Sequence, residues 1–115
     1  MLVKSVKSYK GFAFHVGVEE YKEFEKACKR ELKKQCVKYG INIHKFLSNH
    51  FEWSAVLERA GKFVYVHISD VRFWGDWYDD VLIRTMDHPN DWRGGNNNKT
   101  SFDKIGEFAD RLLNN

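Results

Sequence analysis

Apolar positions recur at helical spacing in the first third of the chain. Between Glu19 and about Tyr39 a stripe repeats every three or four residues, at Phe24, Cys28, Leu32, Gln35/Cys36 and Tyr39. Acidic residues gather early in this segment and basic residues late, which suits the helix dipole. Gly40 follows as a residue suited to end a helix. The pattern predicts one long amphipathic helix over 19–39.

Alternating patterns predict strands on both sides of this helix. Residues 2–6 and 11–17 have the composition of short strands, and 51–59 with 62–70 form the clearest hairpin, around Ala60-Gly61. A two-residue turn would set three apolar pairs on one core face: Trp53 with Ile68, Ala55 with Val66, and Leu57 with Val64. A one-residue bulge at Gly61 is the alternative, because Ala-Gly is not a favoured turn pair.

The rest of the chain completes an α+β fold. Residues 81–86 predict a further strand, 87–99 a loop and 102–113 a final helix, with capping-box spacing between Thr100 and Asp103. Ile41 to Asn49 is ambiguous between a short helix and a loop. We expect a single domain over 1–115, in which an antiparallel sheet of about four or five strands is packed on one face by the two helices.

Length and composition indicate a small globular protein. The 115 residues are 43% hydrophobic and 16% aromatic, which is enough for a core and unlike a disordered chain. The net charge of +3 argues against an acidic nucleic-acid mimic. Cys28 and Cys36 would lie about 12 Å apart on the helix, too far for a disulfide. Reduced cysteines, no signal peptide and no membrane segment predict a cytoplasmic protein.

Basic residues concentrate on the second half of the long helix. Six of them, against the single acid Glu31, form a candidate nucleic-acid-binding face: Lys26, Lys29, Arg30, Lys33, Lys34 and Lys38. Such a face can follow a phosphate backbone. The alternative is an ordinary solvated face that complements the helix dipole.

A tract between Asp70 and Gly95 combines aspartate and arginine with three of the four tryptophans. Its candidate partner-binding residues are Trp74, Trp77, Tyr78, Trp92 and Arg93, because Trp, Tyr and Arg dominate protein–protein hot spots. The alternative is a structural clamp in which aspartates hold Arg72 and Arg84, with Asp70 as the partner expected for Arg84. The open question is the 73–79 connection, which either packs down on the sheet or stands out for a partner.

Two further candidate sites have simpler alternatives. Phe63, Tyr65 and His67 share one hairpin face and could stack unpaired bases, unless a helix or the N-terminal strands cover them. Four residues flanking the 81–86 strand are candidate magnesium ligands of a nuclease: Asp79, Asp80, Asp87 and His88. The histidines lack zinc spacing, and neither a nucleophile motif nor a phosphate-binding loop occurs, so we expect no catalytic residue, metal or cofactor.

Three segments resemble small proteins carried by bacterial phages and integrative elements: Ile68-Ser-Asp-Val-Arg72, Leu82-Ile-Arg-Thr85 and Asp91-Trp-Arg-Gly-Gly-Asn96. Some small proteins from those sources are anti-CRISPR inhibitors. The resemblance implies a stoichiometric binder that blocks a host defence complex through its protein or its nucleic acid. It carries over no catalytic residue. We therefore expect a non-enzymatic binding protein, with a direct RNA- or DNA-binding domain and a divalent-metal nuclease as the alternatives.

Overall fold

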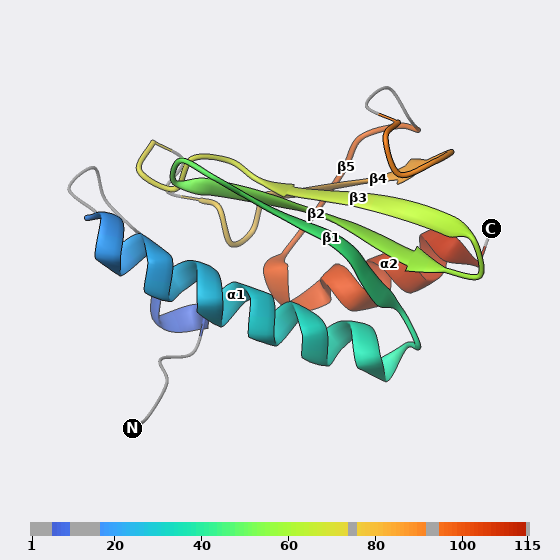
Figure 1. Cartoon of the computed structure of the whole chain (residues 1–115), viewed down its shortest axis with the longest axis horizontal. Coiled ribbons are helices and arrows are strands. Elements are labelled where there is room, and N and C mark those ends of the chain that lie inside the picture. Colours follow the sequence, from blue (N-terminus) through green and yellow to red (C-terminus); the bar gives the residue numbers. More distant parts are fainter. Residues whose placement is uncertain (1–5, 10–16, 74–75, 92–94, 115) are drawn as a thin grey trace.

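The described part of the chain folds as one antiparallel sheet with two α-helices on one of its faces (Figure 1). The computed structural model describes residues 6–9, 17–73, 76–91 and 95–114. The elements in chain order are η1 (Val6–Tyr9), α1 (Val18–Lys38), β1 (Asn42–Asn49), β2 (Glu52–Arg59), β3 (Lys62–Ile68), β4 (Val81–Met86), β5 (Asn98–Thr100), η2 (Phe102–Lys104) and α2 (Ile105–Leu113). The strands lie in the order β1-β2-β3-β4-β5, which confirms the predicted α+β class.

The long helix ends where the sequence predicts. Gly40 has φ +67, and its N–H donates to the carbonyl of Val37 at 3.2 Å. The N–H of Ile41 donates to the carbonyl of Cys36 at 2.9 Å. These two bonds make a Schellman motif, in which a left-handed residue lets the chain turn back over the last helical carbonyls. The turn brings β1 directly alongside the C-terminal half of α1.

The β2–β3 hairpin has the predicted two-residue register. Trp53, Ala55 and Leu57 lie opposite Ile68, Val66 and Val64, and all six are fully buried on the helix-facing side of the sheet. The turn residues Ala60 and Gly61 have φ +53 and +78. Two positive φ values are typical of a type I′ turn, whose twist matches that of the strands. The bulge alternative at Gly61 is therefore wrong.

The segment that the sequence left between helix and loop is the edge strand β1. Its pairing with β2 shifts between Ile43 and Lys45, so that His44 forms a bulge. The bulge places Ile43 opposite Leu57 and Phe46 opposite Ala55, both core-facing residues of β2. Apolar residues three apart on the same face imitate helical spacing, which explains why the alternation of a strand was not visible.

The C-terminal region also departs from the prediction in detail. A short strand, β5, ends the predicted loop, and the helix over 102–113 begins as η2 before it becomes α2. No capping box forms between Thr100 and Asp103; Asp103 instead accepts a hydrogen bond from the hydroxyl of Ser101 at 2.7 Å. Most of the strands expected over 2–6 and 11–17 lies outside the described residues, and Val6 belongs to η1.

The core lies between the sheet and the two helices. Phe24, Cys28 and Leu32 of α1 and Ile105 of α2 are fully buried against it. Among the described residues, no helix is both long and apolar enough to cross a membrane.

Candidate nucleic-acid interface

The six basic residues predicted on α1 are all exposed. The buried stripe of Phe24, Cys28, Leu32 and Cys36 fixes the opposite side of the helix against the core. At four-residue spacing the basic residues form two neighbouring ridges. One ridge holds Lys29 and Lys33, and the other holds Lys26, Arg30, Lys34 and Lys38.

Exposed ion pairs neutralise little of this charge. Lys26 lies 3.8 Å from Glu23, and Lys34 lies 3.9 Å from Glu31, each pair one turn apart on α1. The four side chains are 46% to 73% exposed, and pairs of this kind contribute little to stability. Most of the positive charge therefore stays available to a polyanion.

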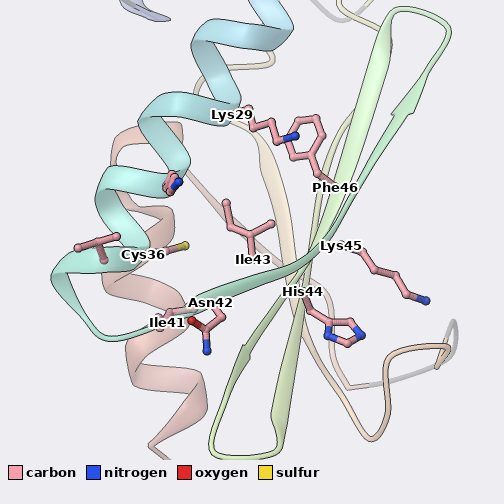
Figure 2. A pocket seen from close by; sticks show the side chains of 10 residues that line it. Lys29, Cys36, Ile41, Asn42, Ile43, His44, Lys45 and Phe46 are labelled. Atoms are coloured by element: carbon pink, nitrogen blue, oxygen red, sulfur yellow. The ribbon is translucent and has the colours of Figure 1, made fainter.

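A groove of about 380 Å³ runs between α1 and the edge strand β1 (Figure 2). Ten residues line it, and none of these described residues is acidic: Lys29, Lys33, Cys36, Val37, Ile41, Asn42, Ile43, His44, Lys45 and Phe46. Figure 2 shows Cys36 and Ile43 facing each other across the space, while His44 and Lys45 point away from the helix. The groove thus has an apolar floor and a rim whose cations come from the Lys29 and Lys33 ridge.

The ring of Phe46 contacts both a buried core residue and a lysine of the groove rim. Phe46 is partly buried and stacks on the fully buried Trp53, with centroids 4.9 Å apart and an interplanar angle of 26°. The ammonium of Lys29 lies over the Phe46 ring, 5.3 Å from its centroid. This is a cation–π contact at an exposed site, where such contacts are weak. A flexible cation therefore covers an aromatic ring that the core holds in place.

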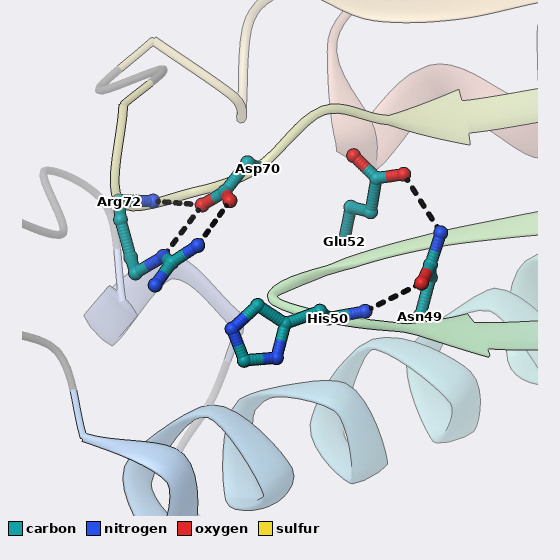
Figure 3. A network of polar contacts seen from close by, with 5 residues as sticks. All are labelled: Asn49, His50, Glu52, Asp70 and Arg72. Atoms are coloured by element: carbon teal, nitrogen blue, oxygen red, sulfur yellow. Dashed lines mark hydrogen bonds and ion pairs between the residues drawn. The ribbon is translucent and has the colours of Figure 1, made fainter.

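The turn between β1 and β2 packs against the tract that follows β3, where the N–H of Val71 donates to the carbonyl of Phe51 at 3.0 Å. Figure 3 shows Asp70 binding Arg72 through both carboxylate oxygens, at 3.0 Å to Nε and 2.7 Å to a terminal nitrogen. The Arg72 guanidinium lies 4.0 Å from the ring centroid of Phe51 and 5.1 Å from that of Phe73. Hydrogen bonds from Arg72 hold the pKa of the Asp70 carboxyl below its ordinary value. The clamp prediction is confirmed for this pair.

Arg84 does not bind Asp70, contrary to the prediction. Its side chain is 5% exposed, lies 4.8 Å from the ring centroid of Tyr65, and donates to the carbonyls of Thr85 and Asp91 at 3.3 and 3.1 Å. Asp70 instead finds Arg72 two residues away in the same turn. Backbone carbonyls and an aromatic face thus solvate a buried guanidinium that we expected to need a carboxylate.

The expected partner-binding tract is largely structural where it is described. Trp77 is fully buried and Tyr78 is 5% exposed, so these two residues pack down on the core, as the clamp alternative expects, and neither is free to bind a partner. Trp77 packs edge-on against Phe24 with centroids 4.7 Å apart, and its Nε1 donates to the carbonyl of Tyr9 at 3.3 Å. Apolar neighbours brought from distant segments bury the two rings. Trp74, Trp92 and Arg93 lie outside the described residues.

Sequence reasoning missed one exposed aromatic residue in this tract. Phe73 is 67% exposed and stands beside the guanidinium of Arg72. Nothing in the local sequence indicated that Phe73, rather than Trp77, would face outward.

The second hairpin face lies on the side of the sheet away from both helices (Figure 1). The alternative that a helix covers this face is therefore wrong, and most of the N-terminal strands, the other cover considered, lie outside the described residues. Phe63, Tyr65 and His67 are nonetheless only partly exposed. The ring of His44 meets Phe63 edge-on at 5.5 Å, and Tyr65 lies under Arg84. Neighbouring side chains of the sheet thus occupy much of this face.

The geometry of the described residues does not support the metal-nuclease alternative or a nucleophilic cysteine. Asp79 and Asp80 precede β4 while Asp87 and His88 follow it, so the strand holds these candidate ligands at opposite ends. No group of three or more His, Cys, Asp or Glu side chains that could hold a metal occurs in the described part of the chain. Burial raises the pKa of the Cys36 thiol to about 12 and that of Cys28 well above its ordinary value, which disfavours the nucleophilic thiolate.

No protein family matches the chain, and neither a curated protein nor a solved structure shows significant similarity to it.

Proposed function

We propose that the protein is a non-catalytic binding protein that takes the phosphate backbone of a nucleic acid along the basic side of α1. The observation that carries the proposal is the groove between α1 and β1, which places Lys29 and Lys33 over an apolar floor with no acidic residue among those that line it. A solvated helix face needs no such groove. Lysines beside a groove can neutralise successive phosphates and release their counterions.

The inhibitor role remains a prediction that rests on the resemblance of three short segments. An inhibitor could dock on a protein through the Trp/Asp/Arg tract or contact nucleic acid through α1. The first mode cannot use Trp77 and Tyr78, because both are buried. The second mode can use all six basic residues of α1, because all six are exposed. The nucleic-acid mode is therefore the one that we carry forward.

Salt-dependent binding tests the proposal. Fluorescence anisotropy would measure the Kd for a labelled single strand and a labelled duplex over a series of salt concentrations. The double variant Lys29→Gln/Lys33→Gln removes two cations from the groove. It should weaken binding and reduce the slope of log K against log salt by about 1.4 for a single strand or 1.8 for a duplex.

The matched control is Lys62→Gln/Lys104→Gln, which removes the same charge at exposed positions outside α1. The control should keep nearly the wild-type slope. Absence of salt-dependent binding, or an equal loss in both double variants, would contradict the proposal.

A further inference from the structure

The floor of the groove offers a surface that a phosphate backbone alone would not use. Phe46 lines the groove, and its ring is held by stacking on the buried Trp53. What lies over the ring is the Lys29 ammonium, which belongs to an exposed side chain on a flexible stem. A flat aromatic ligand can displace that cation at small cost, because exposed cation–π contacts are weak.

After displacement from the Phe46 ring, the Lys29 ammonium can still bind a phosphate of an anionic ligand. Lys29 and Lys33 lie one helical turn, about 6 Å, apart on the same ridge. Both therefore remain beside the groove and can bind the phosphates that flank a base resting on Phe46. The same few residues then supply a stacking platform and a cationic track, which are the two elements that sequence-tolerant single-strand binders combine.

We infer, on the basis of the proposed function, that the groove takes single-stranded rather than duplex nucleic acid, with a base stacked on Phe46 and phosphates on Lys29 and Lys33. In a duplex the bases are paired and stacked, so their faces cannot reach an aromatic floor. The groove volume of about 380 Å³ is at the small end of the range for ligand sites, which suits one base and not a double helix.

An extended peptide added to β1 is the competing occupant of this edge. The bulge at His44 interrupts the regular pairing geometry of the edge strand. Bulges and lysines are the features by which proteins protect sheet edges against the addition of a further strand. The bulge and Lys45 make this edge poorly suited to a peptide strand, whereas Lys29 and Lys33 on the neighbouring helix favour a polyanion.

The test compares an oligothymidylate of about 12 nucleotides with a duplex of the same length, using the whole chain. The wild-type protein should bind the single strand more tightly, by roughly fivefold or more. Phe46→Leu should remove most of this preference and leave the duplex Kd unchanged, and Phe46→Tyr should retain it. The control Phe108→Leu alters a partly buried phenylalanine that also lies beneath a cation, Arg111 at 4.8 Å, and should change neither affinity.

An abasic strand of the same length makes the test independent of how well Phe46→Leu folds. The wild-type protein should bind the abasic strand as weakly as it binds the duplex. Equal affinity for the three probes, with Lys29→Gln/Lys33→Gln still weakening all of them, would overturn base stacking and leave the proposed function standing. Absence of salt-dependent binding to every probe would overturn both, as would tighter binding of an acidic peptide at the same groove.

Discussion

The side chain of Gln35 in α1 caps the N-terminus of α2 at Gly106. Its Oε1 accepts the backbone N–H of Gly106 at 2.8 Å, and its Nε2 donates to the carbonyl of Phe102 at 2.9 Å. The residue at the N-cap position, Lys104, makes no side-chain capping bond. One amide therefore satisfies two backbone groups at a helix start and joins the two helices.

Replacing Gln35 by leucine should destabilise the fold. Leucine has a similar size but leaves both backbone groups without this partner, which costs about 1–3 kcal/mol in the free energy of unfolding. Urea denaturation measures the change. The adjacent Lys34→Leu is the control, because Lys34 is exposed and should change stability by no more than about 0.5 kcal/mol. Equal effects of the two substitutions would show that the cap contributes nothing.

The β2–β3 turn should be improved by Ala60→Asn. Ala60 has φ +53, a conformation that costs a residue with a Cβ atom roughly 1 kcal/mol and that asparagine tolerates better. Asn-Gly is also the favoured pair for a type I′ turn. Thermal unfolding should show a gain of up to about 1 kcal/mol. A loss of stability would mean that the turn does not require two positive φ values.

Trp77 should behave as a core residue in mutagenesis. Trp77→Ala removes a fully buried indole and should cost about 3–5 kcal/mol, enough to threaten folding. Trp77→Phe keeps an aromatic ring and should fold with a smaller loss. Calorimetry with circular dichroism measures both. A Trp77→Ala variant that keeps wild-type stability would show that this residue is not part of the core.

The free energy of unfolding should decrease as the pH is lowered, because the partly buried His67 becomes protonated. Burial lowers the pKa of this histidine below its ordinary 6.5, while Glu52 opposes the shift and Lys99 adds to it. The unfolded chain then binds a proton more readily than the folded chain, so stability is full above about pH 6.5 and is lost as pH falls through the lower folded value. Denaturation at a series of pH values should show this loss, and His67→Gln should reduce it. An unchanged pH profile in His67→Gln would contradict the assignment.

The periodic elements were predictable from the sequence because each has a face that repeats without interruption. The α1 stripe and the β2–β3 alternation are regular, and the structure keeps both. β1 was not predictable, because one bulge at His44 changes the phase of its pattern. The Gln35 cap joins residues 71 positions apart, a distance over which local capping rules give no information.

The candidate site was predictable only in part. Charge and helical spacing were enough to place six basic residues on an exposed face. The groove beside them depends on how β1 turns back along α1, and no local pattern encodes that. Whether Trp77 is buried could not be decided from the sequence, because its burial depends on Tyr9 and Phe24, which the fold brings from far away in the chain.

A ¹⁵N NMR titration of the protein with the oligothymidylate can locate the bound strand on the groove. It reports the binding site without any substitution. We predict that amide signals of α1 over 26–38 and of the segment 41–46 shift together and saturate, while those of β4 and the C-terminal half of α2 stay in place. Shifts confined to the 70–80 tract or to the sheet face that carries Tyr65, or no shifts at low salt, would contradict the assignment of the groove as the nucleic-acid site.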